Sequence, residues 1–307
     1  MDGIINVYKE TGYTSFDVVA KLRSILHQKK IGHTGTLDPM AEGVLLVCLG
    51  SATKLVDVLT LKDKCYRVSM QLGIMTDTED ITGTVICQKD IPRDLTKQQV
   101  IDVLHDYVKS YDQIPPMYSA IKKDGKKLYE YARAGISVER TPRNVTIFSI
   151  DDIVIDLPVV SFNVHCSKGT YVRSLCRDIG DTLGTGATMT SLVRQEVNGL
   201  KACDALRLSQ IEKCMVDGTI MNYIISMDSV LQAYKAIHIK NEFLKYLVNG
   251  NKLYCNQFEV CDPSFDCELF RVYAKERLVA LYQYRQDDHM LRPYKMFLNE
   301  QDLREQK

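Results

Sequence analysis

The sequence has no long apolar run, since no stretch approaches the roughly 20 residues that a helix needs to cross a membrane. Its N-terminus shows no basic segment followed by an apolar core and a small-residue cleavage site, so we expect no export signal and a cytoplasmic protein. Ten cysteines are present, but no Cys-x-x-Cys pair occurs and no histidines accompany them at zinc-site spacing. The cysteines therefore indicate reduced thiols, and we expect no metal site.

Net charge is also absent, because 39 basic and 39 acidic residues leave a formal charge of zero. A neutral balance argues mildly against a polyanion as partner, but the distribution of charge matters more than its sum. The basic residues gather in two segments, namely Lys21, Arg23, Lys29 and Lys30, and later Lys122, Lys123, Lys126, Lys127, Arg133, Arg140 and Arg143. The neutral chain therefore carries local basic surfaces.

Residues 32–43, Gly-His-Thr-Gly-Thr-Leu-Asp-Pro-Met-Ala-Glu-Gly, connect a helical pattern to an apolar run. Glycine permits close backbone approaches and Pro39 donates no backbone hydrogen bond, so Asp38 is presented on a stiff, non-helical turn. Loops of this kind usually carry function rather than core. The alternative is a connector in which Asp38 caps a turn and His33 fills space.

Apolar periodicity predicts the main elements of the chain, whose 307 residues suffice for a large domain with a small one or for two middling domains. Helices are predicted from Thr14-Ser15, from Ser51, over 96–109 and over 171–180. Strands are predicted over 3–8, 44–49, 64–72, 144–157 and 159–166. After about residue 227 the pattern changes to short strands over 253–260, 269–274, 277–284 and 294–298. Tyr66 falls on the apolar side of its strand, and 73–83 is predicted to be a polar, acidic loop.

Residues 113–143 combine basic and aromatic side chains after Pro115 and Pro116, which forbid a helix at the start. Lysine supplies phosphate contacts and tyrosine supplies stacking faces, a mixture that holds an RNA loop. The interleaved tyrosines are Tyr118, Tyr129 and Tyr131. An ordinary basic surface loop with a short helix is the alternative, and the segment by itself leaves both open.

A resemblance to a known family rests on several strings. Residues 32–43 resemble the signature Gly-His-Thr-Gly-x-Leu-Asp-Pro-x-Ala-x-Gly of the TruB family of tRNA pseudouridine-55 synthases, bacterial type. Residues 76–83 are similar to its Thr-Asp-Thr-x-Asp-x-x-Gly, and 169–173 match its Gly-Thr-Tyr-Val-Arg. The resemblance runs from the first strand to about Gly199, and thinly onward through a module similar to a PUA-type RNA-binding domain.

The fold that this resemblance implies is α+β. A pseudouridine synthase core over 1–228 would have a mixed, mainly antiparallel sheet flanked by helices, and a small β-rich, PUA-like RNA-binding module would occupy 229–307. Two departures from the family pattern occur, because its Asp-Lys-Pro is Tyr8-Lys9-Glu10 here and its Leu-Arg-Arg is Leu192-Val193-Arg194. Neither touches the implied catalytic set, so they bear on substrate docking.

The resemblance implies a catalytic set of three residues. Asp38 matches the catalytic aspartate, which attacks the sugar or the base or assists a glycal route. Tyr66, in Tyr-Arg-Val, matches the tyrosine that stacks on the base and takes part in the late proton transfer. Arg173 matches the arginine paired with the aspartate. A buried carboxylate becomes neutral unless a cation or hydrogen bonds hold its charge, so Asp38 needs such a partner.

Further residues are implied as substrate contacts. Asp80 matches the acidic member of an electrostatic trio, and His33 the histidine that occupies space vacated by the flipped nucleotide. Tyr171 and Leu192 resemble pocket-lining residues. Residues 113–143 are similar to the family's flexible thumb and would contact the RNA backbone through Lys122, Lys123, Lys126 and Lys127.

The implied activity is isomerisation of uridine 55 in the T-arm of tRNA to pseudouridine. The bond between sugar and base breaks, the base rotates, and it rejoins through carbon 5. No electrons are exchanged, so no cofactor is expected. The expected partner is tRNA, extruding one nucleotide costs about a few kcal/mol, and no obligatory protein partner is expected.

Three alternatives are weaker. The guide-RNA-dependent branch of the same class works with protein partners and carries extensions that this chain lacks. A non-catalytic tRNA-binding or tRNA-folding protein would leave Asp38, Tyr66 and Arg173 unexplained. A glycosidase needs a second carboxylate within a few ångströms of Asp38, for which Asp80 is the one candidate in the sequence, and it gives the basic, tyrosine-rich segment no purpose.

Overall fold

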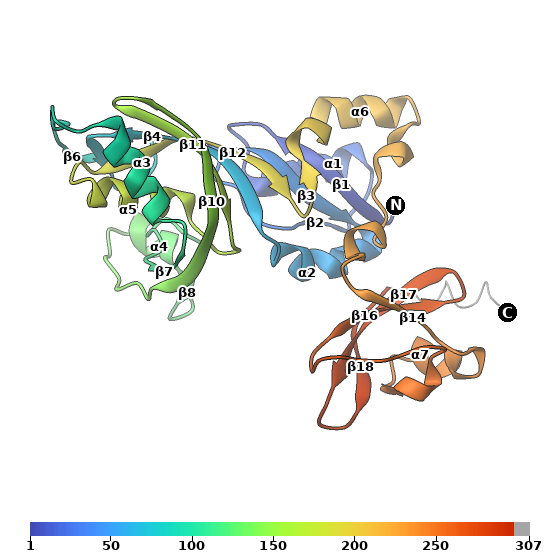
Figure 1. Ribbon diagram of the computed structural model, residues 1–307. Helices are drawn as coiled ribbons and strands as arrows, with labels where there is room; N and C mark the ends of the chain where they lie inside the picture. The colour runs from blue at the N-terminus through green and yellow to red at the C-terminus, as the bar shows by residue number, and fades with distance from the viewer. Residues whose placement is uncertain (298–307) are drawn as a thin grey trace.

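The computed structural model describes residues 1–297, and its main feature is a nine-stranded sheet (Figure 1). The sheet has the order β1-β3-β12-β4-β11-β10-β7, with β2 on β3 and β13 on β12. These strands are β1 (Gly3–Lys9), β2 (Ile31–His33), β3 (Glu42–Leu49), β4 (Lys64–Leu72), β7 (Ser110–Gln113), β10 (Arg143–Asp156), β11 (Val159–Cys166), β12 (Ala187–Val197) and β13 (Leu200–Lys201). The β12–β3 pair is parallel and the other pairs are antiparallel, so the predicted mixed, mainly antiparallel sheet is confirmed.

Helices flank this sheet in two groups (Figure 1). One group lies near β10 and β7 and consists of α3 (Lys97–Asp106), α4 (Leu128–Arg133) and α5 (Val172–Thr182). The other lies near β1 and β3 and consists of α1 (Ser15–Ile25), α2 (Val56–Thr60) and α6 (Leu208–Val216). Helix α1 begins where predicted, because the Thr14 hydroxyl accepts from the Asp17 backbone and the Asp17 carboxylate accepts from the Thr14 backbone.

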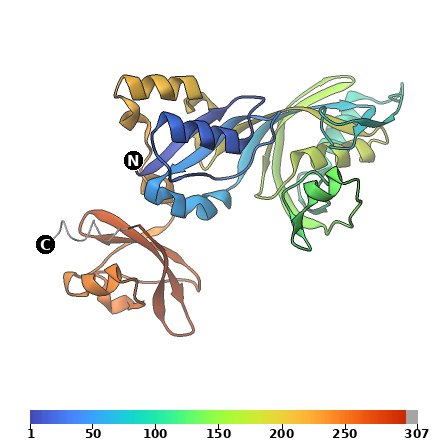
Figure 2. The same ribbon diagram turned by 180° about the vertical axis from the view of Figure 1, so that it is seen from behind.

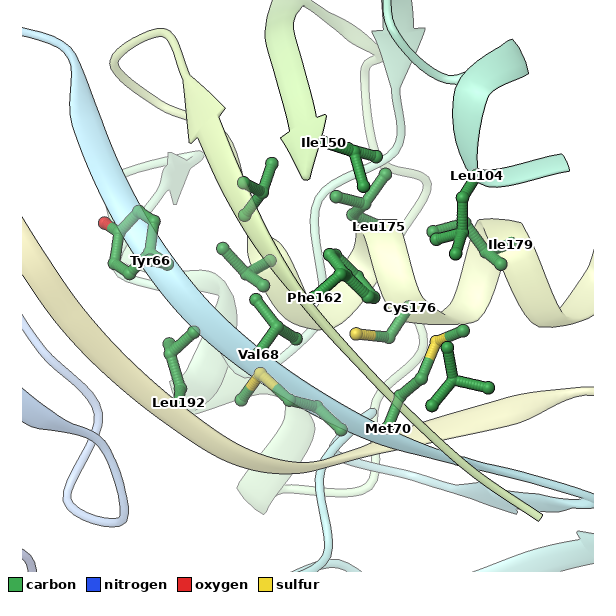
Figure 3. Close-up of a cluster of buried hydrophobic side chains, with 14 of the residues drawn as sticks. Tyr66, Val68, Met70, Leu104, Ile150, Phe162, Leu175, Cys176, Ile179 and Leu192 are labelled. Atoms are coloured by element: carbon green, nitrogen blue, oxygen red, sulfur yellow. The ribbon is translucent and has the colours of Figure 1, made fainter. Parts of the chain in front are cut away.

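The alternation in β4 decides which of its side chains face the core. Its residues are alternately buried and half-buried, with Tyr66, Val68 and Met70 buried as predicted. They belong to a cluster to which α3, β10, β11, β12 and α5 also contribute (Figure 3). Its other members labelled in the figure are Leu104, Ile150, Phe162, Leu175, Cys176, Ile179 and Leu192. This packing sets α5 against the sheet.

Several elements differ from the sequence prediction. Residues 73–83 belong to a hairpin, since β5 (Ile74–Thr76) pairs with β6 (Val85–Gln88). The exposed Val85 and Ile86 supply no burial signal that could have revealed it. The helix expected over 96–109 ends at Asp106, and the one expected from Ser51 begins as a 3-10 turn before α2. The thumb segment contains a two-residue hairpin, β8 (Lys122–Lys123) with β9 (Lys126–Lys127), ahead of α4.

A second sheet lies at the C-terminal end, as the β-rich prediction stated. Its order is β14-β16-β17-β18-β15, and α7 (Leu244–Val248) lies beside it (Figure 1). The strands are β14 (Lys235–His238), β15 (Leu253–Tyr254), β16 (Leu269–Ala274), β17 (Arg277–Arg285) and β18 (Met290–Met296). The predicted strand over 253–260 was wrong beyond its first two residues, and β14 was missed, because runs this short carry too little periodicity. The predicted last strand starts earlier than expected, and its residue 298 lies outside the described residues.

The second sheet packs against the main domain on the side of α2 (Figure 2). Leu281 and Phe297 share a buried cluster with Ile4 and Leu55. The Lys295 ammonium also pairs with Asp57, at 2.6 Å between Nζ and Oδ2. The boundary at residues 228 and 229 stays a prediction. Within residues 1–297 no helix is long and apolar enough to span a bilayer.

Candidate active site

A cavity of about 850 Å³ opens between the sheet, the start of α5 and the thumb segment. Five predicted site residues line it, namely Asp38, Tyr66, Tyr171, Arg173 and Leu192. The cavity wall also holds residues that were not among the predicted site residues, including Lys64, Ser119, Arg143, Lys168 and Arg194. Four of these five are basic, which suits a polyanionic substrate.

Side chains from β1 and α1 hold the backbone of the loop that carries Asp38. Lys9 is fully buried, and its ammonium donates to the carbonyl oxygens of Pro39 at 3.2 Å and Ala41 at 2.6 Å. The backbone N–H of Leu37 donates to Ser15 Oγ at 2.9 Å. Burial lowers the pKa of Lys9 to about 8, against the opposing effect of Asp38. The turn is therefore fixed from both β1 and α1, so Asp38 is presented in one geometry.

Arg173 pairs with Asp38 in a two-pronged contact. Its Nε lies 2.9 Å from Asp38 Oδ2, and its Nη2 donates to Asp38 Oδ1 at 3.2 Å. The Arg173 side chain is 6% exposed, whereas that of Asp38 is 33% exposed and can meet a substrate. Paired N–H donors match the geometry of a carboxylate, which makes such a pair directional as well as strong.

The remaining guanidinium atoms of Arg173 are also occupied. Nη1 lies 3.3 Å from Asp80 Oδ2 and donates to the Thr78 carbonyl at 2.9 Å, and Nη2 donates to the Tyr118 carbonyl at 3.0 Å. Asp80 is buried and does not line the cavity, so it contacts Arg173 from behind. The prediction that Asp38, Arg173 and Asp80 lie together therefore agrees with the geometry, while their roles stay predictions.

Tyr66, Tyr171 and Leu192 approach the cavity from different elements. Tyr66 is 7% exposed, and burial raises the pKa of its hydroxyl to about 12. Tyr171 precedes α5, where its backbone N–H donates to Gln113 Oε1 at 2.9 Å and its carbonyl accepts from Gln113 Nε2 at 3.1 Å. Leu192 stands opposite Val68 across the β12–β4 pair. Gln113 was missed, because a glutamine that binds backbone carries no distinctive sequence signal.

The other predicted contacts lie outside the cavity wall. His33 sits on β2 with a buried Nδ1 that has no hydrogen-bond partner among the described residues, and burial lowers its pKa. Its position next to the Asp38 loop agrees with the prediction, but it does not line the cavity. The four predicted lysines, Lys122, Lys123, Lys126 and Lys127, lie on the β8–β9 hairpin, also away from the wall. The Lys127 ammonium lies 5.4 Å from the ring centre of Tyr129, which does line the cavity.

Glu79 is a buried acidic residue that the sequence did not reveal. It accepts from Ser174 Oγ at 2.6 Å and from the Arg177 guanidinium, both on α5. Arg140, at the end of the thumb segment, lies 3.8 Å away. These contacts fix the segment that contains Thr78 and Asp80 against α5. They therefore determine where the Asp80 carboxylate meets Arg173. Within residues 1–297 no group of three or more His, Cys, Asp or Glu side chains is arranged to hold a metal ion.

A pH dependence follows from the environment of Asp38. Burial raises the pKa of this carboxyl above its ordinary 3.8, Arg173 opposes the shift, and Asp80 adds to it. Ionised Asp38 therefore disappears as the pH falls through this raised pKa. If the ionised form is required, kcat/KM should decline on the acid side at a pH above 3.8. Rate profiles from acid to neutral pH would check this, and a decline centred at or below 3.8 would contradict it.

The chain is similar over nearly its whole length to curated relatives. It is 48% identical over 309 residues to the tRNA pseudouridine synthase B of Lachnoclostridium phytofermentans, with 97% of this chain and 100% of that protein covered. It is 44% identical over 274 residues to the tRNA pseudouridine synthase B of Clostridium perfringens, with 89% and 91% covered. Among solved structures, a chain from a Cbf5-Nop10-Gar1 complex superposes with a TM-score of 0.75 at 26% identity, covering 97% of this chain and 86% of that one.

Two family models match adjoining parts of the chain. The TruB family pseudouridylate synthase (N terminal domain) matches residues 23–172, and the tRNA pseudouridylate synthase B C-terminal domain matches residues 173–232. With the fold and the cavity, these matches define an isomerase of the pseudouridine synthase class. The chain belongs to the TruB family. The family, fold class and enzyme class predicted from the sequence are confirmed.

Proposed function

We propose that this enzyme isomerises uridine 55 in the T-arm of tRNA to pseudouridine, with Asp38 as the catalytic carboxylate. The relatives named tRNA pseudouridine synthase B support tRNA as the substrate. The observation that carries the proposal is the ion pair of Asp38 and Arg173, in which a buried guanidinium binds a carboxylate that lines the cavity. Arg173 favours the ionised form of Asp38 although burial opposes it.

The charges around Asp38 suit the bond cleavage. One guanidinium contacts two carboxylates, so the trio of Asp38, Arg173 and Asp80 carries an excess negative charge when both acids are ionised. Breaking the bond between sugar and base develops positive charge on the sugar. Fixed negative charge aimed at that place stabilises the transition state without reorganisation. Asp38 then attacks the sugar or the base, or assists a glycal route, and the base rejoins through carbon 5.

Tyr66 is the residue we assign to the base and to the last proton. Its ring lies on the cavity side of β4, near Leu192, where a planar base can stack (Figure 3). We assign its hydroxyl, an ionisable group in the cavity wall, the removal of the proton from carbon 5. The whole reaction rearranges bonds without net oxidation, so we assign it no redox cofactor.

The cavity and its basic rim suit an extruded nucleotide. A volume of about 850 Å³ lies in the range of small-molecule sites, about 300–1,000 Å³. Extruding the nucleotide costs about a few kcal/mol, which contacts to the phosphate backbone can offset. We assign these contacts to Arg143 and Lys168 at the rim and to the lysines of the β8–β9 hairpin.

Tritium release from an unmodified tRNA transcript labelled at carbon 5 of its uridines tests the proposal. We expect about one equivalent of tritium per tRNA, since one uridine loses its carbon-5 proton. A matched transcript with cytidine at position 55 should bind but release none. If the wild type binds tRNA and releases no tritium, a non-catalytic tRNA-binding or tRNA-folding protein becomes the better account.

A further inference from the structure

Arg194 of β12 is a buried cation without an acidic partner. Its side chain is among the largest fully buried ones, and the residue is 1% exposed. Its Nε donates to the Val44 carbonyl at 2.7 Å and its Nη2 to the Gly35 carbonyl at 3.2 Å. No ion pair within 4.0 Å joins Arg194 to a carboxylate in residues 1–297. An uncompensated buried charge is costly, so this position calls for a reason beyond packing.

Across the β12–β4 pair, Arg194 faces the ionisable hydroxyl of Tyr66. The two residues stand directly opposite each other in the β12–β4 pairing, beside an irregularity between Arg194 and Glu196. Residues directly opposite each other in an antiparallel pair point to the same face of the sheet, and both side chains line the cavity. The guanidinium carries a positive charge and only donors, so it favours the ionised form of the Tyr66 oxygen that it faces. Arg194 thus opposes the rise that burial causes in the pKa of Tyr66.

We propose that Arg194 is a positioning residue that stabilises the phenolate of Tyr66 while this oxygen removes the proton from carbon 5. The inference rests on the proposed function, in which Tyr66 takes that proton. The uncompensated charge of Arg194 then has its counter-ion in the phenolate during the last step. Two other buried cations line the cavity wall. Arg173 already pairs with Asp38 and Asp80, and the Lys64 ammonium donates to the carbonyls of Thr60 at 3.1 Å and Lys62 at 2.5 Å.

The last step of the isomerisation removes the proton from carbon 5. After the sugar has joined carbon 5, that carbon is tetrahedral and bears both the sugar and a hydrogen, and the ring has a double bond between carbon 6 and nitrogen 1. The phenolate oxygen of Tyr66 takes the hydrogen as a proton. The electron pair of the broken bond forms the double bond between carbons 5 and 6, and the former ring double bond moves onto nitrogen 1. Nitrogen 1 takes a proton from water, and Tyr66 returns its own proton to solvent.

A deuterium isotope effect separates this role from a structural one. Deuterium at carbon 5 of the substrate uridines slows the proton-removal step, whereas cleavage and rotation leave that bond intact. In Arg194→Met, kcat should fall about tenfold or more, as expected for a weakened general base. The isotope effect on kcat should rise above that of the wild type, because proton removal becomes rate-limiting. KM should stay within about twofold, since the change spares ground-state binding.

Two further variants complete the test. Arg194→Lys keeps a cation but loses the planar fork, so it should recover part of kcat and show an intermediate isotope effect. It also carries the test if Arg194→Met fails to fold. Arg67→Met is the matched control, because Arg67 neighbours Tyr66 on β4 but donates away from the cavity to the Asp152 carbonyl at 2.9 Å. Its kcat and isotope effect should equal those of the wild type.

The outcomes distinguish this inference from the proposed function. Tyr66→Phe should lower kcat and raise the isotope effect; if it matches the wild type in both, the role proposed for Tyr66 itself is wrong. If Tyr66→Phe behaves as expected but both Arg194 variants keep the wild-type isotope effect, the inference about Arg194 is overturned alone. A rise in KM with unchanged kcat would likewise overturn it and would make Arg194 a substrate-binding residue.

Discussion

Asp38→Asn is expected to abolish tritium release from the labelled transcript, with a loss of at least about 10⁴-fold in kcat, the scale seen when a group central to bond-breaking chemistry is removed. The amide keeps the size of the carboxylate and one oxygen that can accept from Arg173. It has no negative charge to place near the sugar and is a poor nucleophile. The loss therefore falls on the chemical step rather than on folding.

Measurements of tRNA binding and of folding distinguish a loss of catalysis in Asp38→Asn from a loss of binding or of structure. Affinity for tRNA should change by less than about twofold, because Asp38 is one small contact in an interface dominated by phosphates. Asp94→Asn, at an exposed turn, removes the same charge and should leave tritium release intact. If Asp38→Asn retained more than about a tenth of the activity, Asp38 could not be the catalytic carboxylate.

Arg173→Met is expected to have the second-largest effect, a loss of about 10²–10³-fold in kcat together with lower stability. Without the guanidinium, Asp38 loses the cation that favours its ionised form. The acid-side decline of the rate should therefore shift to higher pH than in the wild type. Arg173→Lys restores a charge without the two-pronged geometry, so its rate should lie between the two.

The stability loss in Arg173→Met comes mainly from Asp80. This carboxylate is 6% exposed in its side chain, and removing its cation leaves a buried charge that costs about 3–5 kcal/mol when unpaired. Hydrogen bonds from Thr78 Oγ1 at 2.9 Å and the Thr82 backbone at 3.0 Å remain, so the cost should lie at the lower end. Urea unfolding measures it.

A double variant separates the loss of activity in Arg173→Met from its loss of stability. Asp80→Asn in the Arg173→Met background should recover most of the stability, because it neutralises the more deeply buried of the two carboxylates that Arg173 paired, but it should not recover activity. If the double variant were as unstable as Arg173→Met, the loss would come from the Thr78 and Tyr118 carbonyls left without their donor. If Arg173→Met kept the wild-type rate, the proposed electrostatic role would be wrong.

Local rules in the sequence were enough for the elements that bear the site. The two-residue alternation of β4 predicted that Tyr66 faces inward, and the structure agrees because one face of that strand is buried. The Thr14 cap marked the start of α1 in the same way. The choice of Asp38, Arg173 and Asp80 as one group came from the family strings, since no periodicity relates residues so far apart along the chain.

The contacts that position the site could not be predicted from residue types. Arg173 binds the carbonyls of Thr78 and Tyr118, and Lys9 binds those of Pro39 and Ala41. Any residue offers a carbonyl, so the sequence carries no trace of such partners. The β5–β6 hairpin was missed for a different reason. Its apolar residues Val85 and Ile86 are both exposed, so they do not show the alternation that marks a half-buried strand.

The sequence by itself determined the family, the α+β class, the inward face of β4 and the loop that presents Asp38, because local patterns and contiguous strings express these. The tertiary structure alone decided that Asp80 supports Arg173 from behind, that the predicted lysines stand off the cavity wall, and that Arg194 faces Tyr66. Strand register and the packing of α5 create these contacts. Both depend on how distant segments bury their apolar faces together, which no local stretch of sequence expresses.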